Sequence, residues 1–198
     1  MARIVVAGSA GALGRSAVRA LTDAGHDVIA VDKDDVDLSD ANAVATWADS
    51  VAAGGPVDGL VHVVGGWRGG GGVAGQTDED WAFLSLLLID TLRLTSRALF
   101  PALAAAGGRL LIVSTVGLDK PTAGNANYLA AKAAAEAWTR ALGAELAKTG
   151  GAGEVIRIMA LFTDADRDKD PGKDWSRHTH VDDLAGEIAA RFAPPSPS

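Results

Sequence analysis

The chain has 198 residues and a formal net charge of −7, and 48% of its residues are hydrophobic. This length fits one domain with a single substantial core, and the acidic balance argues against a nucleic acid or an anionic membrane as a partner. Because the chain contains no cysteine, disulfides and cysteine-ligated metals are excluded.

The first residues lead directly into a glycine-rich stretch and lack the apolar core and cleavage site of a signal peptide. No uninterrupted apolar stretch reaches the roughly 18 residues that a membrane-spanning helix requires. We therefore expect a cytoplasmic protein that interacts with neither membranes nor nucleic acids.

Short apolar runs alternate with helix-length segments rich in alanine and leucine, which is typical of βαβ units around a parallel sheet. The expected strands are residues 4–7, 28–31, 59–64, 110–113 and 155–160, with a short extra strand at 36–38. The expected helices are residues 14–24, 41–53, 78–106, 128–148 and about 181–192.

Two details of these helices can be read from single residues. Pro101 predicts a kink or a break in the third helix, and Thr179 or Asp182 is expected to cap the last one. The pattern predicts an α/β, Rossmann-type doubly wound parallel sheet flanked by helices. It forms a single domain over residues 1–193, and residues 194–198 are expected to be a frayed tail.

A glycine turn joins the first expected strand to the first helix, with Gly8, Gly11 and Gly14 in the spacing G-x-x-G-x-x-G around Ala12 and Leu13. A side chain there would block the approach of a pyrophosphate, while free N–H groups and the helix dipole stabilise the anion. A purely structural turn would also use glycine. The position between a strand and a helix favours a dinucleotide site.

An aspartate, Asp32, ends the second expected strand about 20 residues after this turn. Its carboxylate can accept hydrogen bonds from the adenosine ribose hydroxyls and would repel a 2′-phosphate, which favours NAD(H) over NADP(H). Lys33 could offset that repulsion, so NADP(H) stays open, and a surface-turn aspartate is the alternative. Asp37 is expected near the adenine, with Leu38 beside it.

Tyr128 and Lys132 stand four residues apart on one face of an expected helix. A nearby ammonium favours the phenolate, so we expect Lys132 to lower the tyrosine pKa towards a value useful for proton transfer. Lys132 can also hydrogen-bond the nicotinamide ribose. A chance pair on an exposed helix is the alternative, but Tyr128 is the only tyrosine in the chain.

These motifs together resemble the short-chain dehydrogenase/reductase family across nearly the whole chain. They are the glycine turn, Asp37-Leu38, the strand end Leu111-Ile112-Val113-Ser114-Thr115, and Asn125-Ala126-Asn127-Tyr128-x-x-x-Lys132. The resemblance implies a Rossmann-type fold, a nicotinamide cofactor and a Tyr/Lys/Ser active site. It also implies a homodimer or homotetramer that pairs the helices at 78–106 and 128–148.

A narrower similarity is to dihydropteridine reductases. The segment from Val63 to Gly70 looks like their G-G-W-x-G-G stretch. It implies Gly65 and Gly66 beside the cofactor, NADH as the hydride donor and a quinonoid pterin as the acceptor. Trp67 would either stack on a flat ring or cap the sheet, and Arg68 would contact an anionic or carbonyl-bearing substrate.

The chain departs from the family pattern in two places. The stretch from Leu86 to Asp90 lacks the usual asparagine, and Leu161-Phe162-Thr163-Asp164 replaces the usual Pro-Gly. The third catalytic position has two candidates, because counting thirteen residues back from Tyr128 gives Thr115, whereas the distance to Gly117 favours Ser114. Adjacent strand residues face opposite sides, so only one hydroxyl serves.

No metal is expected, since His178 and His180 lack a convincing third ligand, and His62 is expected as a hydrogen-bonded core histidine. The sequence therefore predicts an NAD(P)(H)-dependent oxidoreductase acting on a small-molecule carbonyl or conjugated imine. An inactive dinucleotide-binding scaffold protein and a non-redox lyase or cyclase are the alternatives.

Overall fold

A parallel five-stranded sheet organises the molecule. The computed structural model describes residues 1–193, so the tail expected at residues 194–198 lies outside the described part. The strands pair in the order β2-β1-β3-β4-β5 and are all parallel. Their bounds are Arg3–Ala7 (β1), Asp27–Val31 (β2), Gly59–His62 (β3), Arg109–Thr115 (β4) and Ala152–Ile158 (β5).

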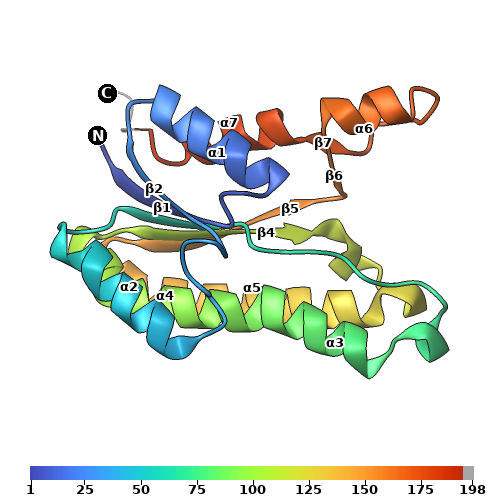
Figure 1. Ribbon diagram of the computed structural model, residues 1–198, viewed down its shortest axis with the longest axis horizontal. Helices are drawn as coiled ribbons and strands as arrows, with labels where there is room; N and C mark the ends of the chain where they lie inside the picture. Colours follow the sequence, from blue (N-terminus) through green and yellow to red (C-terminus); the bar gives the residue numbers. More distant parts are fainter. Residues whose placement is uncertain (194–198) are drawn as a thin grey trace.

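Helices cover both faces of this sheet (Figure 1). Helices α1 (Ala12–Asp23) and α7 (Val181–Ala190) lie on one face, and α2 (Ala41–Ala53), α4 (Thr91–Ala106) and α5 (Ala126–Leu146) lie on the other. A short α6 (Asp164–Lys169) stands beside a separate two-stranded parallel sheet of β6 (Leu161–Phe162) and β7 (Thr179–His180). The expected doubly wound Rossmann-type fold in a single domain is confirmed.

The core has two layers because alternate residues of each buried strand face opposite sides. Ile4 and Val6 of β1 pack with the apolar side of α1 and α7. Val5 of β1 points the other way, into the layer formed with α2, α4 and α5. Burial on both faces explains why the strands read as continuous apolar runs in the sequence.

The extra strand expected at residues 36–38 is wrong. The chain after β2 forms turns instead, in which aspartates bond to neighbouring backbone amides: Asp34 N donates to Asp32 at 2.8 Å and Ser39 N donates to Asp37 at 2.9 Å. Such local bonds compete with strand pairing. Leu38 is nevertheless buried and joins the core.

The helix expected at residues 78–106 is confirmed in its bounds, but a π-helical turn interrupts its α-helical geometry. Helix α3 (Asp78–Ser85) passes into a π-helical turn, η2 (Leu86–Asp90), before α4 begins. The Thr91 hydroxyl donates to the Leu87 carbonyl at 2.8 Å, which satisfies a carbonyl within the π turn. Pro101 does not break α4. Because proline has no N–H, the carbonyl of Arg97 loses its helical hydrogen bond. Both residues lie on the exposed side of the helix, where water can bind this carbonyl.

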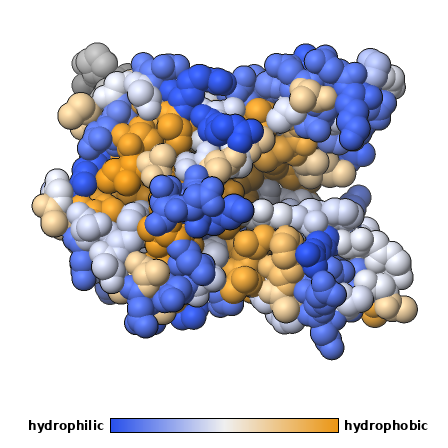
Figure 2. All heavy atoms as spheres, viewed as in Figure 1, coloured by the Kyte–Doolittle hydropathy of each residue, from blue (hydrophilic) through white to orange (hydrophobic). Residues whose placement is uncertain are grey.

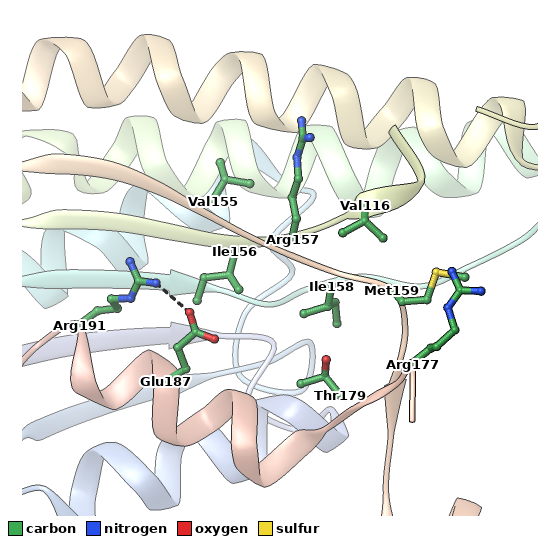
Figure 3. A pocket seen from close by; sticks show the side chains of 10 residues that line it. All are labelled: Val116, Val155, Ile156, Arg157, Ile158, Met159, Arg177, Thr179, Glu187 and Arg191. Carbon is green, nitrogen blue, oxygen red and sulfur yellow. Dashed lines mark hydrogen bonds and ion pairs between the residues drawn. The ribbon is translucent and has the colours of Figure 1, made fainter. Parts of the chain in front are cut away.

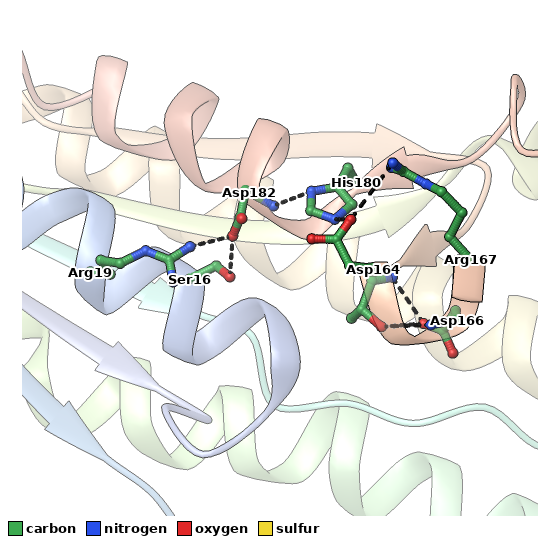
Figure 4. A network of polar contacts seen from close by, with 8 residues as sticks. Ser16, Arg19, Asp164, Asp166, Arg167, His180 and Asp182 are labelled. Atoms are coloured by element: carbon green, nitrogen blue, oxygen red, sulfur yellow. Dashed lines mark hydrogen bonds and ion pairs between the residues drawn. The ribbon is translucent and has the colours of Figure 1, made fainter. Parts of the chain in front are cut away.

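The last helix is capped by His180, not by Thr179 or Asp182, since its imidazole accepts from Asp182 N at 3.3 Å. The Asp182 carboxylate instead accepts from Ser16 at 2.6 Å and from Arg19, both on α1. His180 Nε2 lies 3.5 Å from Asp164 at the start of α6. These contacts, drawn in Figure 4, join the start of α7 to α1, the helix that follows the glycine turn, and to α6.

Four short 3₁₀ turns complete the described chain: η1 (Val73–Gly75), η3 (Val116–Asp119), η4 (Ala123–Asn125) and η5 (Ala147–Thr149). All five strands of the main sheet differ from the expected bounds by one to three residues at one or both ends, most of all β3 and β5. Strand β3 ends at His62, and β5 begins at Ala152 and ends at Ile158, after which the chain turns into β6. The segment after β5 therefore leaves the main sheet and covers its carboxyl end.

Candidate functional site

A crevice opens where the direction of strand order reverses. The chain passes from β1 to β2 on one side and returns to β3 on the other, which leaves a gap beyond their carboxyl ends, the usual ligand site of such sheets. Two cavities of about 480 and about 720 Å³ occupy it, called here the first and the second chamber. They share Gly11, Val63, Val64 and Gly65, and Figure 2 shows the surface hollowed between the two helical layers.

The glycine turn forms the wall between the two chambers. At Gly8, where φ is +89°, an added Cβ would lie 2.7 Å from Val64 N, and at Gly14 it would lie 2.0 Å from the Gly8 carbonyl oxygen. These two glycines are therefore required by protein packing. A Cβ at Gly11 would meet nothing closer than 3.3 Å, so Gly11 is the glycine whose open side faces the crevice.

Helix α1 begins at this turn with Gly11 as its N-cap, without a side-chain cap and without an acidic residue in its first turn. The first N–H groups of the helix, including those of Ala12 and Leu13, therefore face the crevice without a side-chain acceptor. An anion is stabilised at such a helix start. The turn fits a pyrophosphate.

The first chamber contains the acidic residues expected at the adenosine. Asp32, Lys33, Asp37 and Leu38 all line it. Asp32 accepts from Asp34 N and lies 3.4 Å from the Ser9 hydroxyl, which leaves its half-buried carboxylate at the chamber wall. Asp37 is exposed, and the hydroxyl and amide of Ser39 lower its pKa; part of its function is therefore to hold this turn.

The second chamber brings together most of the remaining predicted residues: Gly11, Ala12, Leu13, Gly14, Gly65, Gly66, Trp67, Ser114, Thr115, Tyr128 and Lys132. The exception is Arg68. Its guanidinium lies 3.2 Å from Asp80, 3.6 Å from Glu79 and 3.8 Å from the centre of the Phe83 ring. Arg68 thus packs on α3 and does not line either chamber.

Tyr128 and Lys132 lie side by side on α5, with Lys132 Nζ 5.9 Å from the centre of the phenol ring. Lys132 Nζ donates to the Val113 carbonyl at 2.7 Å. Burial raises the pKa of Tyr128 and lowers the pKa of Lys132 to about 8. The expectation that Lys132 lowers the tyrosine pKa is wrong, because desolvation of the buried phenol raises that pKa.

A buried carboxylate stands one turn beyond this pair, and the motifs gave no sign of its role. Glu136 is 1% exposed and receives two bonds of 2.7 Å from Arg157 of β5, besides an ion pair with Arg140. Burial alone would raise the pKa of Glu136. The hydrogen bonds from Arg157, together with the smaller effects of Ser114 and Arg140, outweigh it, so the pKa of Glu136 is lowered. Its negative charge in turn raises the pKa of Lys132 against the effect of burial.

Both candidate hydroxyls are buried at the end of β4. Thr115 Oγ1 accepts from Gly117 N at 3.0 Å and caps the η3 turn. The hydroxyl of Ser114 faces Glu136 and helps to lower the pKa of that carboxyl. Ser114 pairs in register with Arg157, whose side chain reaches Glu136 on the α5 side of the sheet. Thr115 belongs to the opposite face by strand alternation.

The loop that carries Trp67 is held by a residue that the sequence did not single out. Gln76 donates to the carbonyls of Gly70 and Gly124, both at 3.0 Å, and accepts from Asn127 N at 3.0 Å. This one amide therefore joins the glycine-rich loop to the start of α5. A lone polar residue within a glycine-rich segment gives no sequence signal for such a role.

His62, at the end of β3, lines the second chamber and is 4% exposed. Burial, and to a lesser degree the charge of Lys132, lowers its pKa to about 3. Its Nε2 has no hydrogen-bond partner. The expected core histidine is thus buried and neutral, but it is not fully hydrogen-bonded.

A further cavity of about 630 Å³ lies outside the crevice, between the free edge of β5 and α7 (Figure 3). Its arginines are mostly engaged, since Arg157 turns towards α5 and Arg191 bonds to Glu187 and Glu154. Among residues 1–193 no group of three or more histidines, cysteines or carboxylates could hold a metal ion. No helix in that range is long and apolar enough to cross a membrane.

Comparison with known proteins agrees with this geometry. Residues 2–180 match the short-chain family model described as enoyl-(acyl carrier protein) reductase. The crystal structure titled gox2181 superposes with a TM-score of 0.77 at 20% sequence identity, covering 97% of this chain and 91% of that one. At that identity the likeness concerns the fold alone. No curated protein matches.

Proposed function

The chain belongs to the short-chain dehydrogenase/reductase family, whose members are NAD(P)-dependent oxidoreductases, and on that premise we propose that it is an NADH-dependent reductase. Its acceptor is a small carbonyl compound or a conjugated imine of the pterin type. The observation that carries the proposal is that Tyr128, Lys132 and the glycine turn, far apart in sequence, line one chamber.

The two chambers account for the two halves of a dinucleotide. The pyrophosphate would lie on the free N–H groups at the start of α1, and the adenosine would lie in the first chamber against Asp32, beside Asp37 and Leu38. The carboxylate of Asp32 favours NADH over NADPH because it would repel a 2′-phosphate. Gly65, Gly66 and Lys132 remain for the nicotinamide half, and a bound nicotinamide would supply the hydride.

The raised pKa of Tyr128 suits the direction of reduction. At neutral pH its phenol keeps its proton and can donate it to the substrate oxygen or nitrogen as hydride arrives. The ammonium of Lys132 then stabilises the phenolate that remains. Thr115 donates a hydrogen bond to the substrate's polar group, because its Oγ1 only accepts from Gly117 N and keeps its own proton free, whereas the Ser114 hydroxyl interacts with Glu136.

The test is a comparison of wild type with Tyr128→Phe. NADH binding is followed by fluorescence, and NADH oxidation at 340 nm is followed with quinones, ketones, quinonoid dihydropterin and an unsaturated acyl thioester. We expect the variant to bind NADH like wild type and to lose about 10²–10⁴-fold in turnover. Unchanged turnover would remove this mechanism.

Two other outcomes favour the alternatives. Binding of NADH without its consumption across the whole panel would indicate a dinucleotide-binding scaffold protein. Product formed without net oxidation of NADH would indicate a lyase or cyclase.

A further inference from the structure

The second chamber differs in charge from the protein that surrounds it. Acidic residues outnumber basic ones by 25 to 18 in the whole chain. The lining of this chamber nevertheless contains two lysines, Lys120 and Lys132, and no aspartate or glutamate. Such a site favours a negatively charged ligand, because a cleft with walls of one sign raises the local concentration of the opposite charge.

The two lysines are not equivalent. Lys132 is engaged by the Val113 carbonyl and stands beside Tyr128. Lys120 is exposed and forms no ion pair among residues 1–193. Its neighbour Asp119 is turned away to Arg157 at 2.9 Å. Lys120 therefore presents an uncompensated charge at the chamber, on the loop between Thr115 and Tyr128.

Apolar side chains surround the same opening. Trp67 is 61% exposed, Met159 48% and Leu161 37%, and these are three of the eight large hydrophobic residues that are exposed in the described chain. The indole of Trp67 donates to Asn125 Oδ1 at 3.2 Å, which fixes the orientation of its ring. Exposed apolar surface gathered at a cavity marks a binding site.

We propose that the acceptor substrate combines a flat apolar ring system with an anionic group. The ring lies against the indole of Trp67, with Met159 and Leu161 closing the other side, and the anion meets the ammonium of Lys120. This inference rests on the proposed function, and it makes Lys120 the residue that selects charged acceptors over neutral ones.

The experiment measures binding and does not require hydride transfer. Naphthalene-2-sulfonate and the neutral 2-naphthalenemethanol are titrated by calorimetry into the protein, with and without saturating NAD⁺. We expect the sulfonate to bind about 3- to 10-fold more tightly, as for a partly screened ion pair. Lys120→Gln should remove this preference, and Trp67→Leu should weaken both ligands alike.

A matched control is Lys148→Gln, which makes the same charge change at a lysine paired with Glu145, away from the chamber. It should leave both affinities unchanged. Equal affinity of the two ligands for wild type would overturn the inference, and so would a sulfonate preference that survives Lys120→Gln or disappears in Lys148→Gln.

Failure of the proposed function is visible separately. Turnover of 1,2-naphthoquinone and of its 4-sulfonate with NADH is measured on the same preparations. If neither quinone consumes NADH but the sulfonate preference and its loss in Lys120→Gln persist, the reductase assignment is weakened and the anion site stands. If both are reduced but the binding preference is absent, the anion site is wrong and the reductase stands.

Discussion

Acidification tests the burial of His62, the imidazole on the wall of the second chamber. Its pKa is about 3 in the folded protein against an ordinary 6.5. Between these values the unfolded chain binds a proton that the folded protein does not, so stability is complete above pH 6.5 and falls as the pH drops towards 3. At pH 5 the unfolded state gains roughly 2 kcal/mol relative to pH 7.

The assay is urea unfolding at pH 7 and at pH 5 for wild type, His62→Leu and His62→Gln. Other groups that titrate in this range contribute equally to all three proteins and cancel in the difference. The free energy of unfolding of wild type should fall by about 2 kcal/mol more than that of either variant. If the gap between wild type and both variants is the same at the two pH values, the imidazole is not buried in neutral form and the reasoning fails.

Asp32→Ser should raise the affinity for NADPH relative to NADH about tenfold, which corresponds to about 1.4 kcal/mol. Fluorescence titration of both cofactors checks this, with Asp34→Ser as the exposed control. An unchanged ratio of NADPH to NADH affinity in Asp32→Ser would contradict the role of Asp32. Gly14→Ala should cost about 1–3 kcal/mol in urea unfolding and weaken NADH binding, because the new Cβ would meet the Gly8 carbonyl. Gly186→Ala, a helical position with open space around it, should instead stabilise by about 0.5–1 kcal/mol, and equal effects would refute the packing argument. Thr115→Val should lower turnover about 10²-fold, as expected for the loss of one hydrogen-bond donor to the substrate. Ser114→Ala should leave turnover and stability nearly unchanged. If Ser114→Ala causes the larger loss of turnover, Ser114 is the residue that polarises the substrate.

The fold was predictable because its signals are local. A parallel sheet covered on both faces needs continuous apolar strands, and those runs identify all five strands of the main sheet to within a few residues. The two failures have local causes as well. Aspartate side chains bonded to backbone amides replace the strand expected at residues 36–38. Helix α4 continues through Pro101 without the expected break, because Pro101 and Arg97, whose carbonyl loses its helical bond, lie on the exposed side.

The candidate site was predictable only where its residues recur at fixed spacing. The glycine turn and the Tyr128–Lys132 pair are short-range patterns, and the structure places them in one chamber. Glu136 and Gln76 could not be found in this way, because the partners that define their roles are distant in sequence: Arg157 is 21 residues from Glu136, and Gly124 and Asn127 are 48 and 51 residues from Gln76. In the sequence each is an ordinary polar residue, and its role is visible only from the contacts that the fold creates.

The pKa values of Tyr128 and Lys132 also depend on burial, which the spacing of the two residues in the sequence does not report. Spacing places an ammonium beside the phenol and so predicts a lowered tyrosine pKa, but it contains no information about burial. Burial raises the pKa of Tyr128 and lowers that of Lys132 to about 8, so the phenol keeps its proton at neutral pH, which is the form that donates in a reduction. Arg157 donates to Glu136 and keeps that carboxyl ionised, and the negative charge of Glu136 raises the pKa of Lys132 against the effect of burial. The buried carboxylate, which the sequence motifs do not mark, therefore favours the cationic form of the lysine beside a protonated tyrosine.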